Sequence, residues 1–167
     1  MMIVRPEEPE DASSIHAVHA GCFPTESEAR LVRLLRDADQ LLVSLVAEID
    51  HTIVGHVAFS PVTVASGKVG AGLAPLTVIG PRQRQGIGTD LALSGLDDCL
   101  QAGIGWVVVL GDPAYYSRFG FQPATDFGLS DEYGGGAAFQ AIELIPGELP
   151  VGAGLVKYAP QFASLAT

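Results

Sequence analysis

Residues that could hold a phosphate gather between positions 80 and 90, in the order Gly-Pro-Arg-Gln-Arg-Gln-Gly-Ile-Gly-Thr-Asp. An apolar stretch from Leu73 to Ile79 precedes them, and apolar residues recur at helical spacing from Asp90 to Gly103. The first N–H groups of a helix have no partner inside it and carry partial positive charge, so a phosphate can bind there. The glycines let a ligand approach the backbone, and the two arginines add charge. The segment therefore predicts a phosphate-binding turn between a strand and a helix.

Known phosphate-binding turns differ in the residues they require. A Walker-type loop ends in Gly-Lys-Ser or Gly-Lys-Thr, but this chain continues Gly-Thr-Asp. A dinucleotide-binding fingerprint needs a third glycine where this chain has Leu91. What is left is the pattern Gln83-x-x-Gly86-x-Gly88. Two glycines between a strand and a helix also fit a tight connection that binds nothing, so other parts of the chain must decide.

A second motif follows an apolar run from Gly105 to Leu110, which predicts a strand buried on both faces. Asp112 is typical of a helix N-cap and Gly120 of a helix end. The first pattern resembles the acetyl-CoA pyrophosphate loop of the GCN5-related N-acetyltransferases (GNAT superfamily). Tyr116-x-x-x-Gly120-Phe121 resembles a motif that many of these proteins carry after the fifth strand. The whole second segment is similar to one branch of predicted N-acetyltransferases.

The resemblance implies a GNAT fold, of the α/β (α+β) class, with a mixed central sheet of about six to seven strands and helices on both faces. Its fourth and fifth strands run parallel but splay apart. The main-chain groups of Leu76 and Val78 are then expected to bond the pantetheine arm of acetyl-CoA. The pyrophosphate is expected on the loop formed by Gln83, Arg84, Gln85, Gly86, Ile87, Gly88 and Thr89.

The resemblance also implies direct transfer, in which a neutral amine attacks the thioester, a backbone N–H of the fourth strand stabilises the oxyanion, and a thiolate leaves. Tyr116 matches the GNAT tyrosine that gives the thiolate a proton, and a phenol stays protonated at neutral pH. A tyrosine packed into the core is the structural alternative for Tyr116. The sequence predicts the catalytic role.

The base that would deprotonate the amine is not evident. Several GNAT enzymes use a glutamate on the fourth strand, where this chain has Ala74, Pro75 and Thr77. His56, or Glu26 and Glu28, could act through water, although a solvated face or a helix cap also explains the two glutamates. The other histidines have positions typical of ordinary helix or turn residues: His16, His19 and His51.

The predicted elements form an antiparallel meander that leads into a strand–helix–strand crossover, unlike the strict alternation of a Rossmann domain. A helix is expected to start near Thr25, with Glu28 completing a capping box. Residues 126–138 predict a mobile loop, and residues 146–167 are rich in Pro, Gly and small side chains. The predicted strands are Ile3–Pro6, Leu41–Ile49, Thr52–Ala65, Val69–Ile79, Gly105–Leu110 and Phe139–Ile145, and the helices start at Pro9, Thr25, Asp90 and Asp112.

Chain length, net charge and cysteine spacing limit the classes of protein to which this chain can belong. The chain has 167 residues, which suits a single domain over residues 1–167. Nineteen acidic against nine basic residues give a net charge of −10, which argues against nucleic acid and would attract a cationic amine, or simply serves solubility. No apolar run approaches the ~20 residues of a membrane span, so we expect a cytoplasmic protein without a membrane partner. Cys22 and Cys99 lack the spacing of a metal site and predict buried thiols.

The sequence therefore predicts an acetyl-CoA-dependent N-acetyltransferase that uses no metal and acetylates a primary amine of a small molecule or peptide. Two alternatives stay open: a CoA-binding sensor without turnover, and a transferase for longer acyl-CoA donors. The sequence does not name the acceptor, and it leaves open whether two copies form a homodimer.

Overall fold

The computed structural model describes residues 1–166, whose contacts divide the chain into two compact units. Unit 1 contains Met1–Phe59, Pro75–Gly95 and the C-terminal segment from Pro160, and unit 2 contains Ser60–Ala74 and Leu96–Ala159. Two long strands and one helix belong partly to each unit. The expectation of a single domain stays a prediction.

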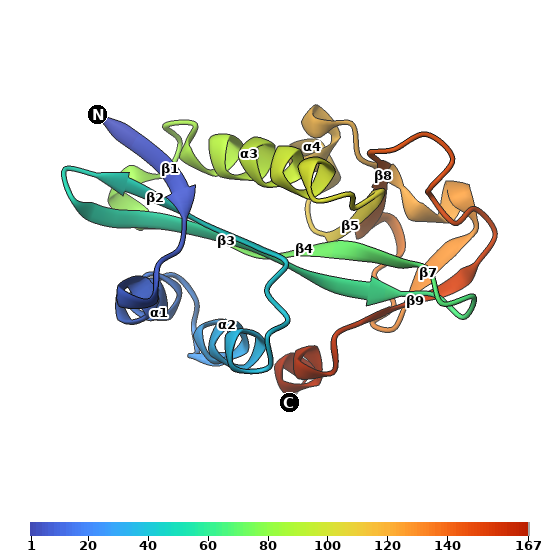
Figure 1. The fold of residues 1–167 in the computed structure, drawn as a ribbon, viewed down its shortest axis with the longest axis horizontal. Coiled ribbons are helices and arrows are strands. Elements are labelled where there is room, and N and C mark those ends of the chain that lie inside the picture. The colour runs from blue at the N-terminus through green and yellow to red at the C-terminus, as the bar shows by residue number, and fades with distance from the viewer. Residues whose placement is uncertain (167) are drawn as a thin grey trace. The chain divides into compact units, whose positions relative to one another are not determined.

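The elements within residues 1–166 are drawn in Figure 1. The strands are β1 (Met2–Pro6), β2 (Val43–Ile49), β3 (Thr52–Thr63), β4 (Val69–Val78), β5 (Trp106–Leu110), β6 (Gln122–Pro123), β7 (Leu129–Asp131), β8 (Phe139–Glu143) and β9 (Gly154–Tyr158). The α-helices are α1 (Ala12–Cys22), α2 (Ser27–Asp37), α3 (Ile87–Gln101) and α4 (Pro113–Tyr116). The 3-10 helices are η1 (Pro9–Asp11), η2 (Gly80–Arg82), η3 (Ser117–Phe119), η4 (Ala124–Phe127), η5 (Gly136–Ala138) and η6 (Pro160–Ala166).

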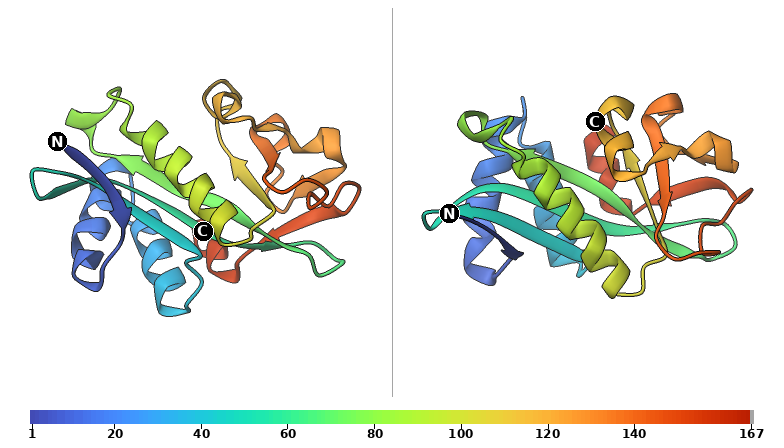
Figure 2. Two further views of the ribbon diagram at one scale, coloured as in Figure 1. Left: turned by 45° about the horizontal axis from the view of Figure 1, so that its top comes forward. Right: turned by 90° about the horizontal axis from the view of Figure 1, so that it is seen from above.

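Unit 1 has helices on both faces of its strands. β1 pairs antiparallel with β2, and β2 pairs antiparallel with β3. Helices α1 and α2 lie on one face, and the first half of α3 lies on the other (Figures 1 and 2). Ile15 of α1, Val32 of α2 and Val46 of β2 form a buried cluster between the two helices and the strand. Because side chains alternate along a strand, the residues on either side of Val46 in β2 face α3.

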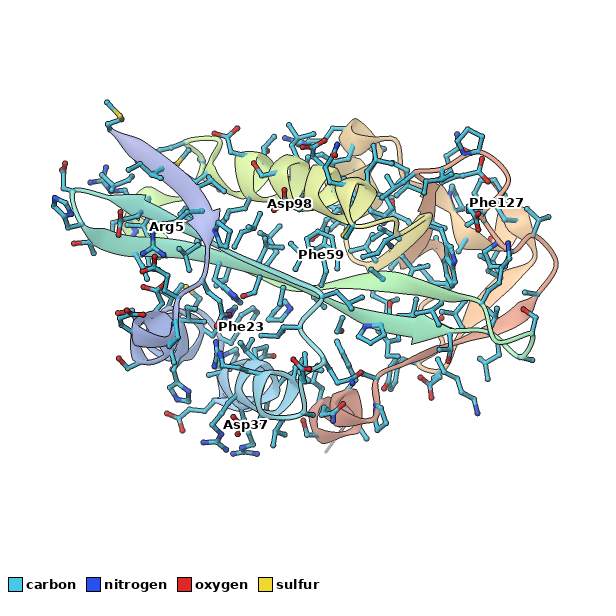
Figure 3. All side chains as sticks on the ribbon, in the orientation of Figure 1. Arg5, Phe23, Asp37, Phe59, Asp98 and Phe127 are labelled. Carbon is cyan, nitrogen blue, oxygen red and sulfur yellow. The ribbon has the colours of Figure 1, made fainter. Side chains whose placement is uncertain are left out.

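Glycines let α3 approach β3 closely in unit 1. A Cβ built at Gly95 on the helix would lie 2.2 Å from a ring carbon of Phe59, and one built at Gly55 on the strand would lie 3.0 Å from Leu91. Figure 3 shows Phe59 on the α3 side of β3 and Phe23 on the side of α1 and α2. The strand alternation therefore separates an apolar α3 face from a second face that carries polar groups described below.

Unit 2 contains the parallel pair. Ala71 and Gly72 of β4 pair with Val107 and Val108 of β5. β5 pairs antiparallel with β8, which also pairs with the short β6. The end of β3 pairs with β9, and β9 runs parallel to β7. Gly70 permits the buried Trp106 ring to lie against the backbone, since a Cβ there would come within 2.4 Å of the ring.

The predicted fold class is confirmed. The hydrogen-bonded strand order is β1-β2-β3-β4-β5-β8-β6, with β7 and β9 off this path, and the sheet is mixed because of the parallel β4–β5 pair. The crossover through α3 follows the sequence prediction, and residues 139–143, within the predicted strand Phe139–Ile145, pair with both β5 and β6. No helix within residues 1–166 is both long and apolar enough to cross a membrane.

Two helix starts differ from the prediction. Helix α3 begins at Ile87 rather than Asp90, because the Asp90 N–H already donates to the Gly86 carbonyl at 3.0 Å. Helix α2 begins at Ser27, and its N-cap residue is Glu26, without a side-chain cap. The expected capping box is therefore wrong. Thr25 instead accepts a hydrogen bond from the Ser27 N–H at 3.3 Å, which closes a local turn.

Residues 126–138 are more regular than the expected mobile loop. β7 pairs with Gly154–Val156, and the Asp131 carboxylate accepts the N–H groups of Tyr133 at 3.0 Å and Gly135 at 2.8 Å. The sequence did not reveal this strand, because it has three residues and its partner lies more than twenty residues further along the chain. The partner strand in this pairing, β9, is the only strand that the structure describes between residues 146 and 166.

Candidate active site

The end of β4 presents alternate main-chain groups away from β3. The Ile79 N–H, directly after β4, donates to the Val54 carbonyl of β3 at 2.9 Å. Main-chain groups of a strand point alternately to its two sides, so those of Leu76 and Val78 point away from β3. This is the orientation that the sequence prediction requires of these two residues. Their side chains need no special chemistry for that role.

The Val78 carbonyl has two partners from other elements. The Gln83 side-chain amide donates to it at 2.9 Å, and the Cys22 thiol at the end of α1 donates to it at 3.4 Å. Gln83 therefore ties the loop to the strand that precedes it. A carbonyl oxygen has two lone pairs, so a ligand amide that donates to Val78 must displace the Gln83 amide or the Cys22 thiol.

The loop Gln83–Thr89, called the 83–89 loop below, is exposed over its first four residues. Gly86 has φ +82° and Arg84 has φ +64°, so two residues of the loop are in the left-handed region. A Cβ built at Gly86 would meet no atom within 4 Å, which leaves open space above the backbone. The Gln85 side chain donates to the Pro81 carbonyl at 3.4 Å.

Helix α3 starts inside this loop. Ile87 is 3 % exposed and anchors the first turn in the core of unit 1. Gly88 and Thr89 follow it in that turn, and the helical hydrogen-bond ladder starts where the Asp90 N–H meets the Gly86 carbonyl. The main-chain N–H groups in the first turn of a helix point toward the start of the helix. The 83–89 loop therefore ends in main-chain donors that lie beside an exposed surface.

Tyr116 belongs to unit 2, at the end of α4. Asp112 caps this helix by accepting the Ala114 N–H at 2.9 Å, and Gly120 ends the following turn with φ +99°, as predicted. The Tyr116 ring packs against Phe121 at 5.9 Å, and a Cβ at Gly111 would lie 2.4 Å from it. Burial, with a smaller contribution from Tyr115, raises the pKa of Tyr116 to about 12. The phenol therefore keeps its proton at neutral pH, as a proton donor must.

The parallel pairing of β4 and β5 is short. Among residues 1–166 it comprises Ala71 with Val107 and Gly72 with Val108, whereas β4 continues to Val78. Pro75, three residues beyond the paired stretch, has no N–H and cannot donate to a ladder. Leu76 and Val78 thus follow the paired part of β4, as a splayed pair requires.

His56, which the sequence suggested as a base, is fully buried on β3. Its Nδ1 lies 2.8 Å from Nε2 of His19 on α1, and its Nε2 lies 2.8 Å from the Ser44 hydroxyl on β2. Ser44 donates to the Glu7 carboxylate, which Arg36 of α2 holds through two hydrogen bonds of 2.7 and 3.2 Å. We call His19, His56, Ser44 and Glu7 the histidine chain.

The charges along the histidine chain are unequal. Burial alone would raise the pKa of Glu7, but the nearby His56 and hydrogen bonds from Arg36 and Ser44 outweigh it and lower this pKa to about 2. Burial, with the nearby His56, lowers the pKa of His19 to about 3. Burial also lowers the pKa of His56, against the raising effect of Glu7. At neutral pH the chain therefore holds one carboxylate and two neutral imidazoles.

The two glutamates suggested as bases lie on or beside α2. Glu26 is exposed, with Oε1 3.8 Å from Nε2 of His16. Glu28 is partly buried, and its Oε2 has no hydrogen-bond partner among the described residues. The structure thus keeps Glu28 as a candidate, whereas Glu26 has the surroundings of an ordinary surface residue.

Sequence reasoning missed most of the histidine chain. It placed His19 among ordinary helix residues and attached no role to Ser44, Glu7 or Arg36. A signal for His19 was present, because it lies four residues after Ile15 on the helix face that also carries Cys22. Nothing in the spacing of the other residues relates them, since they come from separate elements.

In the described part of the chain, the cysteines form no disulfide and the possible metal ligands form no metal site. Cys22 and Cys99 are free thiols, and burial, with a smaller effect from Asp98, raises the pKa of the Cys99 thiol to about 12. Within residues 1–166, no group of three or more His, Cys, Asp or Glu side chains is arranged to hold a metal ion.

Comparisons with known proteins identify the family of this chain. The family model "Acetyltransferase (GNAT) family" matches residues 12–121. The chain is 40 % identical over 164 residues to N-acetyltransferase YhbS of Escherichia coli K12, covering 96 % of this chain and 98 % of the relative. It is 35 % identical over 130 residues to N-acetyltransferase YjhQ of the same strain, covering 74 % and 71 % of the two chains.

Two solved structures extend the likeness to three dimensions. The crystal structure of Escherichia coli YhbS in complex with CoA matches with a TM-score of 0.92 and 39 % identity, covering 97 % of this chain and 92 % of that one. A GNAT acetyltransferase from Brucella melitensis in complex with acetyl-CoA matches with a TM-score of 0.81 and 36 % identity, covering 97 % and 98 %. The chain belongs to the GNAT family of acetyltransferases.

Proposed function

We propose that this GNAT protein transfers an acetyl group from acetyl-CoA directly to a primary amine of a small molecule or peptide. The observation that carries the proposal is the end of β4, where the main-chain groups of Leu76 and Val78 face away from β3 and lead into the exposed 83–89 loop. Two relatives of similar length were crystallised with CoA and acetyl-CoA. Their ligands support acetyl-CoA as the donor for this chain.

The donor fits the residues present. Leu76 and Val78 would pair with the two amides of the pantetheine arm, as an added strand does. The pyrophosphate would lie on the main-chain donors of the 83–89 loop, where the space above Gly86 is open. Arg84, exposed in the same loop, would add a charge-assisted contact. Acetyl-CoA, when bound, supplies the acyl group as an activated thioester.

Tyr116 would protonate the departing sulfur. As the C–N bond forms and the C–S bond breaks, the leaving thiolate needs a proton, which the Tyr116 hydroxyl, protonated at neutral pH, would supply. A main-chain N–H at the end of β4 would stabilise the oxyanion. The net charge of −10 would favour the approach of a cationic amine. The two free thiols, Cys22 and Cys99, are typical of a reducing compartment, which supports a cytoplasmic location.

Thiol release tests this proposal. Purified protein is mixed with acetyl-CoA and a panel of primary amines that includes diamines, amino sugars, peptide N-termini and lysine peptides, and free CoA is measured. We expect release that requires one class of amine. Release by none of them, together with tight CoA binding by calorimetry, would instead favour a CoA-binding sensor without turnover.

The sensor is a second candidate because β4 carries no carboxylate at Ala74, Pro75 or Thr77, where a base would be expected. A transferase that uses a longer acyl-CoA is the third. Parallel assays with acetyl-, propionyl- and butyryl-CoA would separate it from the acetyltransferase, since a longer preferred chain would raise kcat/KM along the series. The homodimer that the sequence left open stays a prediction.

A further inference from the structure

The Val78 carbonyl at the end of β4 already has two donors in the described part of the chain. The Gln83 side-chain amide donates to it at 2.9 Å, and the Cys22 thiol donates to it at 3.4 Å. A carbonyl oxygen accepts through two lone pairs, so these donors fill its capacity. The proposed function asks the same oxygen to accept an amide N–H of the pantetheine arm. One of the two donors must therefore leave before the arm can pair with Val78.

The two donors reach this carbonyl from different parts of unit 1. Cys22 is the last residue of α1, and α1 lies on one face of the strands, so the thiol approaches from that face (Figures 1 and 2). Hydrogen bonds between neighbouring strands instead lie within the sheet, in the direction from strand to strand. Gln83 comes from the chain that leaves β4 and not from a covering helix. The Gln83 amide is therefore the donor that we expect an added strand to meet.

A short 3-10 turn brings Gln83 back to the strand that it follows. The turn η2 begins two residues after Val78, and the Arg82 N–H donates to the Ile79 carbonyl at 2.9 Å. The chain thereby reverses, and a side chain five residues after Val78 reaches the Val78 carbonyl. Glutamine suits this contact because its side chain ends in an amide, the same kind of donor that a pantetheine arm presents.

The Gln83 contact is also the easier one to open. Gln83 and the three residues after it are exposed, so its side chain can turn into solvent without opening the core. The Val78 carbonyl then exchanges one amide donor for another, and the freed glutamine amide binds water. Such an exchange keeps the number of hydrogen bonds and has a small net cost. Cys22, in contrast, is partly buried at its helix end.

We propose that the Gln83 side-chain amide occupies the place of a pantetheine amide at Val78 in the free protein, and that the arm of CoA displaces it. This inference rests on the donor site of the proposed function, in which the arm lies along β4. Gln83 is then a built-in competitor of the arm. Binding of acetyl-CoA opens the contact with Val78, and departure of the product CoA closes it.

The competition predicts a direction and a size. A ligand that needs the open form binds more weakly, in proportion to the fraction of the protein in which that form is populated. A side-chain hydrogen bond of ordinary net strength corresponds to a factor of about five in an equilibrium. Gln83 should therefore weaken the binding of CoA and acetyl-CoA by about fivefold. A nucleotide without the arm should bind equally well whether the contact is open or closed.

The first experiment compares wild type with Gln83→Met, which keeps the length of the side chain but cannot donate. Calorimetry measures the Kd of CoA and of 3′-phosphoadenosine 5′-diphosphate, which is CoA without its pantetheine arm. We expect the ratio of the nucleotide Kd to the CoA Kd to be about five times larger in the variant. The ratio cancels any effect on the phosphates, because both ligands carry the same ones.

Two further variants serve as controls. Gln85→Met removes an amide from the same loop, but that amide donates to the Pro81 carbonyl at 3.4 Å and not to β4. It should change both Kd values by the same factor and leave their ratio at the wild-type value. Cys22→Ala removes the other donor to Val78 and should leave the ratio unchanged too. A ratio that rises in Cys22→Ala and not in Gln83→Met would overturn the assignment to Gln83.

The second experiment uses the wild-type protein. An NMR coupling through the hydrogen bond, between Gln83 Nε2 and the Val78 carbonyl carbon, reports the contact directly. We expect this coupling in the free protein and with 3′-phosphoadenosine 5′-diphosphate, and its loss with CoA. A coupling that persists in the CoA complex would overturn the proposal, because the arm would then leave the Gln83 contact in place.

The outcomes separate this inference from the proposed function. A ratio that is unchanged or smaller in Gln83→Met, in a protein that acetylates an amine, would overturn the inference and leave the transferase intact. Tight CoA binding without thiol release would overturn the transferase alone, since the competition at Val78 needs binding and not turnover. A wild type that binds CoA no more tightly than the nucleotide would overturn both the inference and the donor site. If Gln83→Met fails to fold, the wild-type coupling decides.

Discussion

Unit 1 contains two polar regions built in opposite ways. The 83–89 loop is exposed and uses main-chain groups, with two left-handed residues and open space above Gly86. The histidine chain is buried and uses side chains from separate elements, joined by hydrogen bonds of defined direction. The first construction suits the binding of an anion, because main-chain donors tolerate many side chains. The second suits the handling of a proton, because each step depends on one particular atom.

This difference predicts that side-chain changes at proton-handling residues alter turnover, whereas affinity for CoA depends on the backbone of the loop. The variants below test that division, beginning with the largest expected effect.

Tyr116→Phe removes the hydroxyl proposed as the proton donor and keeps the ring that packs on Phe121. We expect kcat to fall by about 100-fold with CoA affinity unchanged, since a general acid contributes that much or more. Steady-state kinetics and calorimetry measure the two quantities. Tyr115→Phe on the same helix is the control, and equal effects of both variants would exclude a specific role for Tyr116.

Gly86→Asp places a carboxylate and a Cβ at the left-handed position of the loop. We expect CoA affinity to fall by about 50-fold, because a like charge faces the phosphates and the backbone conformation is strained. Gly103→Asp is the matched control, since Gly103 also has φ +82° and open surroundings. If both variants bind CoA equally, the loop is not the phosphate site.

Acid should destabilise the protein through the histidine chain. Folding lowers the pKa of His19 from its ordinary value of 6.5 to about 3, so the unfolded chain binds more protons below pH 6.5. Stability is therefore complete above that pH and falls by roughly 2 kcal/mol for His19 between pH 7 and pH 5. His56 shifts in the same direction and adds to the loss. Glu7, whose pKa is lowered to about 2, adds its loss as the pH falls below about 4.5.

Urea denaturation at pH 7 and pH 5 measures this effect. His19→Gln should show a smaller difference between the two pH values than wild type, even if it is less stable at both. An unchanged difference would mean that His19 is protonated in the folded state, against its burial.

Arg84→Ala should have the smallest effect. The arginine is exposed and would only assist the proposed phosphate site, which the main chain builds, so we expect a loss of about threefold in CoA affinity that shrinks at high salt. Arg33→Ala on the exposed face of α2 is the control. A loss as large as that of Gly86→Asp would contradict a site built mainly from main-chain groups.

The two regions also differ in how far the sequence could predict them. Glycine spacing between an apolar strand and a helix is local in the chain, so the 83–89 loop and its place at the start of α3 could be found directly. Asp112 and Gly120 gave the bounds of the α4 segment for the same reason. Hydrophobic periodicity predicted the meander and the parallel pair, because long strands carry enough residues to show it.

The histidine chain and β7 could not be found in this way. Each depends on which strands lie side by side: Ser44 meets His56 because β2 and β3 pair, and Leu129 meets Gly154 although β8 lies between them in the sequence. Polar residues also look exposed in a sequence unless a partner is known. His19 shows this, because its apolar neighbours at helical spacing marked the face as buried, yet nothing local identified His56 as its partner.

A crystal structure of the wild-type protein with CoA tests the central claim most directly. We predict that the pyrophosphate lies on the main-chain N–H groups of the 83–89 loop and that the pantetheine amides pair with Leu76 and Val78. A pyrophosphate bound elsewhere, with these main-chain groups left to solvent, would contradict the account.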